Sequence, residues 1–129
     1  ERTILSYAWT EKGKSQSFRL DMKLTEKTCV PCQGDIPPLT YKEAVFLLGQ
    51  VPGWILSEAG DKLRKSFTFS DFSSALEFVN LVGEIAEADN HHPDISFGWG
   101  YAEIVVYTHK IKGLHENDFI LAAKVSEIV

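Results

Sequence analysis

Two adjacent histidines stand in the stretch EADNHHPD, residues 87–94, and side chains of these types could move protons. His91 and His92 are half of the four histidines in the chain. An imidazole titrates near neutral pH and can act as both acid and base. Glu87 lies four residues before His91, so the two side chains share a face if the segment is helical. This spacing predicts that Glu87 and His91 lie on one face at the end of a helix, next to His92.

A third histidine, His109, ends a predicted strand that follows Pro93 along the chain. Because that strand belongs to a hairpin, the fold can bring His109 close to His91 and His92. Taken singly, each histidine has a simpler interpretation as a helix cap or a surface residue. Three histidines together with one carboxylate favour a common site.

Other chemistries find less support in the residue patterns. Three histidines could hold zinc, but their spacing matches no metal-binding motif. No serine stands in a G-x-S-x-G nucleophile turn, and the chain has no glycine-rich phosphate loop. Proton transfer by imidazoles is therefore the expected chemistry.

The two cysteines form a CxxC pair, Cys29 and Cys32, in CVPCQGD. Zinc normally takes four ligands, and no second CxxC completes the set. A thioredoxin-type dithiol stands between a strand and a helix, whereas this pair runs into Gly34 and two prolines. We expect two free thiols in a reducing compartment. A zinc site that is shared between subunits, or completed by a distant histidine, is the alternative.

Composition and charge indicate a single globular domain and argue against a nucleic-acid-binding or membrane-spanning protein. An apolar fraction of 44% and a charged fraction of 24% in 129 residues fit one globular domain. The formal charge of −5 argues against a nucleic-acid surface, which needs a basic face. No apolar run approaches the ~20 residues that cross a bilayer, and ERTILSYAW shows no secretory signal. The expected location is the cytoplasm, or an organelle if a targeting peptide has been removed.

The first elements of the predicted domain are a short helix and a hairpin. Thr40 and Glu43 form a capping box that opens the helix, and Gly49 closes it. Residues 54–58 and 62–69 are predicted strands, the second with clean alternation of apolar and polar side chains. Together they predict a hairpin with one buried face.

The second half of the chain repeats this order with a longer helix. Apolar residues recur every three or four positions from residue 71 to about 90, which predicts an amphipathic helix that ends before Pro93. Strands near 94–98 and 101–108 follow, and a last helix runs from about 116 to 128. We therefore predict an α+β fold of two layers, a four-stranded antiparallel sheet made of two hairpins with helices packed on one face.

The predicted domain organisation is asymmetric. Residues 1–38 form an N-terminal extension, with a short strand at 3–9 and a Cys/Gly/Pro-rich linker at 29–38. Residues 39–129 form the domain that carries the histidines.

The spacing of Glu87, His91-His92-Pro93, Trp99, His109 and Asp118 resembles the signature of the pterin-4a-carbinolamine dehydratase family. The resemblance spans about residues 39–128. The motifs CVPC, PPLT and VPGW resemble those of a subgroup with a long N-terminus. The resemblance implies a hydro-lyase that removes water from a 4a-hydroxytetrahydropterin to give quinonoid dihydropterin, which recycles the tetrahydropterin cofactor. It implies no metal and no bound cofactor.

The resemblance also implies roles for individual residues. The catalytic set is His91, His92 and His109. Of these, His91 and His109 are expected to donate and accept the protons, while His92 orients or binds the pterin. The residues expected to bind substrate or shape its pocket are Glu87, Asn90, Trp99 and Asp118. Glu87 is expected to position His91 or to hydrogen-bond the pterin edge. Trp99 would wall the flat ring, or else pack in the core.

Three positions stand outside the family pattern. Asn90 occupies a position where some members carry a carboxylate, and Asn117 a position where some carry an arginine. His115, the fourth histidine, lies outside the motif and is expected to be exposed.

The resemblance further implies assembly as a homodimer or homotetramer around a pterin substrate. The alternative is a non-enzymatic interaction protein on the same fold, either a transcriptional coactivator or an assembly factor. Retention of all three motif histidines favours the enzyme.

Overall fold

The computed structural model of the chain describes residues 23–27 and 37–129. The strand predicted at 3–9 and the CxxC pair, Cys29 and Cys32, lie outside the described residues.

The sheet has four strands, β1 (Ile55–Leu56), β2 (Leu63–Thr68), β3 (Asp94–Gly98) and β4 (Tyr101–Val106). Their order is β1-β2-β4-β3, and all neighbours are antiparallel. The two predicted hairpins are therefore confirmed, and the two hairpins join through β2 and β4. Three of the strands are shorter than predicted, β1 most of all.

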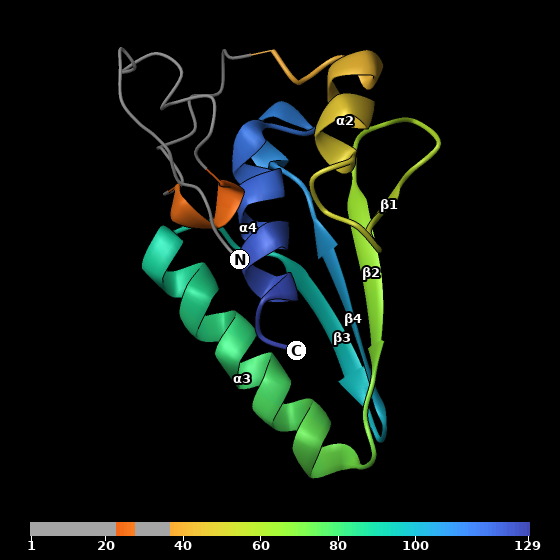
Figure 1. The fold of residues 1–129 in the computed structure, drawn as a ribbon, viewed down its shortest axis with the longest axis vertical. Helices are drawn as coiled ribbons and strands as arrows, with labels where there is room; N and C mark the ends of the chain where they lie inside the picture. Colours follow the sequence, from red (N-terminus) through yellow and green to blue (C-terminus); the bar gives the residue numbers. More distant parts are fainter. Residues whose placement is uncertain (1–22, 28–36) are drawn as a thin grey trace, which may run out of the picture.

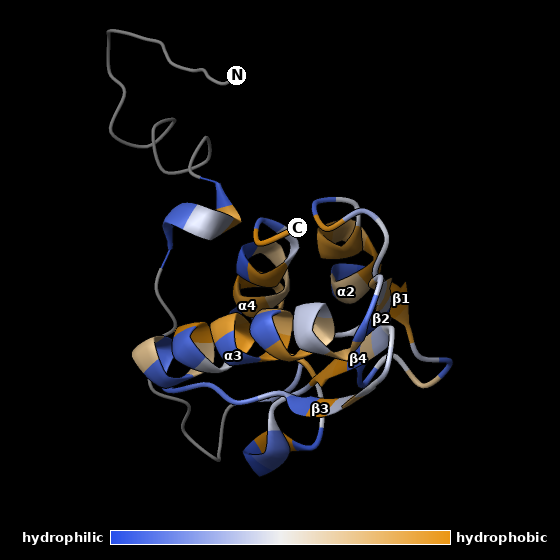
Figure 2. Ribbon diagram, turned by 90° about the horizontal axis from the view of Figure 1, so that it is seen from below, coloured by the Kyte–Doolittle hydropathy of each residue, from blue (hydrophilic) through white to orange (hydrophobic). Residues whose placement is uncertain are grey.

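Three helices, α2 (Tyr41–Leu48), α3 (Phe72–Asp89) and α4 (Glu116–Ser126), cover one face of the sheet (Figure 1). The view along the layers in Figure 2 places all three on the same side of the strands, with α3 and α4 next to each other. The predicted two-layer α+β fold is confirmed. Within the described residues, no helix combines the length and apolar character that crossing a membrane requires.

The core lies between the sheet and α4. Side chains alternate along β4, so Ala102, Ile104 and Val106 all face the helices and are fully buried. Phe119 and Leu121 of α4 are also fully buried in this cluster. Because the apolar residues of α4 pack against the sheet, the first turn of this helix has a fixed position near the end of β4.

Both ends of α3 are defined by local hydrogen bonds. At the start, Ser74 N–H donates to the Asp71 carboxylate at 2.8 Å, and hydrogen bonds from Ser74 hold the pKa of Asp71 below its usual value. At the end, Asn90 takes a left-handed conformation with φ 53°. The backbone N–H groups of Asn90 and His91 then donate to Glu87 O and Ala86 O at 3.3 and 3.1 Å. This Schellman arrangement turns the chain out of the helix before His91.

A short N-terminal segment packs against the domain. The 3-10 helix η2 (Leu24–Glu26) lies beside α4 (Figure 1). Leu24 is only 5% exposed and belongs to the main core cluster. Lys27 Nζ lies 2.7 Å from Glu116 Oε2 at the start of α4. These contacts tie part of the predicted extension to the helix that carries Asp118.

Replacing Leu24 by Ala is expected to lower the free energy of unfolding by about 2–4 kcal/mol, since it removes a large buried side chain and leaves a cavity. Urea denaturation followed by circular dichroism measures the change. The same substitution at Leu81, which is 40% exposed on α3, is the matched control and should cost less than about 1 kcal/mol. Equal decreases in the free energy of unfolding of the two variants would show that packing of Leu24 against the core does not stabilise the domain.

Candidate active site

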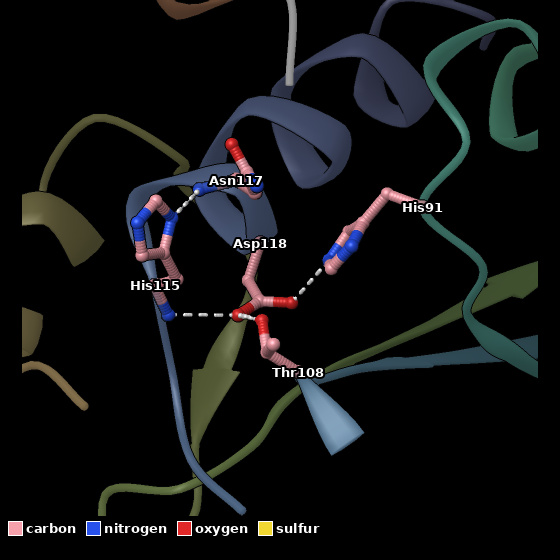
Figure 3. Close-up of polar contacts among 5 residues, drawn as sticks. All are labelled: His91, Thr108, His115, Asn117 and Asp118. Atoms are coloured by element: carbon pink, nitrogen blue, oxygen red, sulfur yellow. Dashed lines mark hydrogen bonds and ion pairs between the residues drawn. The ribbon is translucent and has the colours of Figure 1, made fainter. Parts of the chain in front are cut away.

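Asp118 is the centre of the polar network at the start of α4. Its side chain is fully buried, and three donors converge on it (Figure 3). Thr108 Oγ1 and the backbone N–H of His115 donate to Oδ2 at 2.8 and 2.9 Å, and His91 Nε2 lies 2.7 Å from Oδ1. The position of Asp118 in the first turn also places its charge at the positive end of the helix. Both oxygens of the buried carboxylate therefore have hydrogen-bond partners inside the protein.

His91 is held in a defined orientation by this carboxylate. An ionised carboxylate only accepts hydrogen bonds, so the ring nitrogen that faces Oδ1 must carry a hydrogen. Nε2 is that nitrogen. In neutral His91 the proton therefore sits on Nε2, and Nδ1 is an unprotonated base. The His91 side chain is 11% exposed, which leaves a small part of it accessible.

Thr108 is a member of the network that the sequence analysis missed. It is 4% exposed and continues the buried face of Ala102, Ile104 and Val106 beyond the end of β4. Continued alternation along this strand was the signal that could have found it, because it places a hydroxyl on the core side close to the next helix. A buried hydroxyl needs a partner, and Asp118 supplies the acceptor.

Glu87 does not pair with His91, contrary to the sequence prediction. Its Oε2 lies 2.5 Å from Nε2 of His92. The prediction assumed that His91 continues the helical face of Glu87, but the left-handed Asn90 turns the chain before that position. Both partners of the Glu87–His92 pair are exposed, with 78% and 53% of their side chains accessible to solvent.

His109 does not end a strand, and this prediction is also wrong. Strand β4 stops at Val106, and His109 begins the 3-10 helix η3 (His109–Ile111). The cause is a tight loop in which Thr108 N–H donates to Gly113 O at 2.9 Å and Lys112 takes φ 51°. The exposed His109 ring packs on Tyr107 with 4.1 Å between ring centroids. Because Thr108 binds Asp118, the next residue, His109, lies beside the His91 network along the chain.

The structure separates Trp99 from the histidines within one chain. Trp99 lies in the turn between β3 and β4, and β3 separates this turn from His91. It is 72% exposed, so the alternative of core packing is wrong. Asn90 is exposed beside the Glu87–His92 pair, and its left-handed conformation is one that Asn tolerates well.

His115 is half-buried, contrary to the prediction that it is exposed. The residue precedes α4 and caps its first turn, since the backbone N–H of Asn117 donates to Nδ1 of His115 at 3.1 Å. The sequence motif gave no reason to include it, because histidine is not among the preferred N-cap residues.

The side chains of the described segments form no cluster of three or more histidines, cysteines or carboxylates that could hold a metal ion. The chemistry that the described site can perform is proton transfer by an oriented imidazole. His92 and His109, each adjacent in the chain to a residue of this network, are exposed.

Comparison with known proteins decides the family. The sequence profile of the family described as pterin 4 alpha carbinolamine dehydratase matches residues 37–128. The chain belongs to the pterin 4 alpha carbinolamine dehydratase family. The resemblance carried by the histidine spacing is thus confirmed.

Curated relatives share most of this family member's length. A protein of Methylococcus capsulatus, provisionally named a pterin-4-alpha-carbinolamine dehydratase, is 58% identical over 105 residues, which is 81% of this chain and 92% of the relative. A Cupriavidus pinatubonensis protein with the same provisional name is 56% identical over 106 residues, 82% and 91% of the two chains.

Solved structures of the pterin 4 alpha carbinolamine dehydratase type share the fold. A transcriptional coactivator/pterin dehydratase from Brucella melitensis matches with a TM-score of 0.67 at 30% identity, over 70% of this chain and 97% of the other. A pterin dehydratase-like protein described as a RuBisCO assembly factor in the alpha-carboxysome matches with a TM-score of 0.51 at 23% identity, over 59% and 88% of the chains. The second likeness concerns the fold alone.

Proposed function

We propose that this protein dehydrates a 4a-hydroxytetrahydropterin to quinonoid dihydropterin and water by general acid–base catalysis with His91, His92 and His109. The observation that carries the proposal is the 2.7 Å contact between His91 Nε2 and the buried carboxylate of Asp118. In the neutral ring this contact places the proton on Nε2 and leaves Nδ1 as a positioned acceptor, which is what a general base requires.

The reaction needs two proton transfers and nothing else. The bond between C4a and the hydroxyl oxygen breaks, and the leaving oxygen takes up a proton to become water. The N5–H bond of the ring gives up its proton, and the electron pair forms the C4a–N5 double bond. Protons and electrons balance without an oxidant, so two positioned acid–base groups suffice and no cofactor takes part.

His91 is proposed as the acceptor of the N5 proton. Its Nδ1 is unprotonated in the neutral ring, and Asp118 stabilises the imidazolium that forms when Nδ1 accepts a proton. His109 is then the proposed donor to the leaving hydroxyl. Its exposed ring can exchange its proton with water between turnovers.

The remaining predicted residues are proposed to bind or orient the pterin. The exposed Glu87–His92 pair offers a carboxylate and an imidazole to the polar edge of the ring, with Asn90 beside it. Asp118 is proposed to orient His91, because both of its oxygens already accept hydrogen bonds inside the protein. Since Trp99 lies a strand away from His91, we propose that it walls a pterin only if a second subunit brings it to the site.

Assembly as a homodimer or homotetramer in the cytoplasm is part of the proposal. The described surface of α3 supports an assembly, since Phe72 and Leu76, one turn apart on the same side of the helix, are 45% and 38% exposed. Such apolar surface is commonly covered between copies of a chain.

The wild-type protein is expected to accelerate the loss of 4a-hydroxytetrahydropterin that is generated in situ, as followed by stopped-flow absorbance. Replacing His109 by Ala should lower this acceleration about 10²-fold, the lower end of the usual range, because the leaving hydroxyl loses its positioned acid and water can replace it at this exposed position. Lys110→Ala changes an exposed neighbour in the same turn and serves as the matched control. If the folded wild-type protein gives no acceleration over buffer, the proposed activity is wrong.

An interaction function is the second candidate. The 30%-identical Brucella melitensis protein is described as a transcriptional coactivator as well as a pterin dehydratase. Absence of dehydratase activity in a folded, assembled protein would favour this candidate.

A further inference from the structure

The helix that carries Asp118 begins with an unusual cap. N-cap positions favour Ser, Thr, Asp and Asn, whose side-chain oxygens accept a hydrogen bond from the first turn throughout the neutral pH range. In α4 the acceptor is the ring nitrogen Nδ1 of His115, which receives the Asn117 N–H at 3.1 Å. The Asp118 carboxylate closes the capping box, because its Oδ2 accepts the His115 backbone N–H at 2.9 Å.

This cap depends on the protonation state of His115. A ring nitrogen accepts a hydrogen bond only while it carries no hydrogen, so His115 must be neutral with its proton on Nε2. A protonated ring carries hydrogen on both nitrogens and cannot accept the Asn117 N–H. It would also place a positive charge at the positive end of the helix dipole.

The cap of α4 and the orientation of His91 share one carboxylate. Oδ2 of Asp118 binds the backbone of His115, and Oδ1 faces His91 Nε2. Figure 3 shows Asp118 between the two histidines, with the His115 ring turned toward Asn117 and away from His91. A change in the first turn of α4 therefore moves the group that orients His91.

We propose that His115 is a pH-sensitive positioning residue: its neutral ring holds Asp118 in place for His91, and its protonation releases the first turn of α4 and lowers the dehydratase rate. The effect on rate rests on the proposed function, whereas the cap itself rests on the hydrogen bonds alone.

The charged and titratable groups around His115 come from several elements. On α4 itself they are Asp118 and Glu116, and Glu116 is paired with Lys27 of the N-terminal segment. From the end of α3, His91 shares Asp118. The carboxylates favour a charged ring electrostatically, while the hydrogen bond from Asn117 requires a neutral one. The cap depends on pH because uptake of a proton at Nδ1 of His115 removes the acceptor of the Asn117 N–H.

The first test is the tautomer of His115, measured by long-range proton–nitrogen NMR of the imidazoles in the wild-type protein, with His115→Ser used to assign the signals. At pH 8 we expect hydrogen on Nε2 and none on Nδ1. On acidification the Asn117 amide signal should shift together with the titration of the His115 ring. Hydrogen on Nδ1 at pH 8 would overturn the proposal.

The second test compares dehydratase rates of the wild type and His115→Ser between pH 8 and pH 6. Serine caps the same turn without titrating, so the ratio of variant to wild-type rate isolates the His115 proton. The ratio should be near one at pH 8 and rise steadily as the pH falls to 6, because only the wild-type cap loses its acceptor on protonation. His115→Ala has no cap and should be slower than His115→Ser throughout. A ratio that does not change with pH, or equal rates in the two variants, would overturn the proposal.

The stability of the protein, measured by thermal unfolding, tests the His115 cap independently of the proposed dehydratase activity. Because the folded cap requires a neutral ring while the unfolded chain can take up the proton, wild-type stability relative to His115→Ser should fall as pH drops through about 6.5, where an ordinary imidazole titrates. If the wild type is inactive, the dehydratase assignment fails and this stability difference still tests the cap. A pH-independent difference in stability would overturn it.

Discussion

Replacing Asp118 by Asn should lower the dehydratase rate by about 10³-fold, or about 4 kcal/mol in activation free energy. Two donors, Thr108 Oγ1 and the His115 N–H, converge on Oδ2 of Asp118. The single oxygen of the Asn amide is best placed there, which leaves its NH2 group facing His91. His91 Nε2 must then accept a hydrogen bond, and the ring proton moves to Nδ1. The nitrogen proposed to accept the N5 proton is thereby blocked.

Stopped-flow rates and imidazole NMR of the Asp118→Asn variant measure the two parts of this prediction. The inverted His91 tautomer is the spectroscopic sign of the mechanism. Glu116→Gln removes a carboxylate two residues earlier in the same turn and is the matched control, expected to stay within about threefold of wild type because its ion pair is partly exposed. A folded Asp118→Asn variant with near wild-type rate would show that the carboxylate does not orient the base.

Replacing His91 by Gln should reduce the rate by about 10²- to 10⁴-fold, the usual contribution of a positioned acid–base group. Gln keeps an amide N–H donor that can reach Asp118, so the buried carboxylate need not lose its third partner. It cannot accept a proton at neutral pH. The decrease in rate of the His91→Gln variant therefore measures the loss of proton transfer rather than a loss of folding.

His92→Gln is the comparison variant for His91→Gln. His92 is adjacent in sequence but exposed, and its partner Glu87 is exposed as well. A binding or orienting role predicts about a tenfold loss, expressed mainly in KM. Equal losses in kcat for the two variants would contradict the assignment of His91 as the base, and circular dichroism of both variants excludes unfolding as the cause.

The elements of this domain follow from local sequence signals. The three- and four-residue spacing after Asp71 predicted α3, and alternation predicted the buried face of β4 with Ala102, Ile104 and Val106. Capping signals at Thr40 and Glu43 placed the start of α2 correctly. Each of these signals lies within a few residues of the feature that it predicts, because hydrogen bonds within a turn and side-chain alternation are short-range effects.

The partners of the site residues did not follow from such signals. Helical spacing predicted that Glu87 and His91 would lie on one face. The left-handed residue Asn90 ends the helix before His91, and Glu87 pairs with His92 instead. A second left-handed residue, Lys112, belongs to the loop that places His109 in a 3-10 helix. One residue in the left-handed conformation changes the direction of the chain and therefore the partners of the side chains next to it. The hydrophobic pattern of the sequence does not predict where such a residue occurs.

Local patterns in the sequence identified the strands, the helices and the buried face of β4, together with the histidines and their family spacing. No local pattern predicted that His91 contacts Asp118, 27 residues further along, that Thr108 belongs to this network or that His115 caps α4. The reason is that these contacts depend on how α4 packs against the sheet beside the end of α3. That packing is the sum of many apolar contacts among residues far apart in the chain, and it fixes the distance and direction of each polar group only when the whole core has formed.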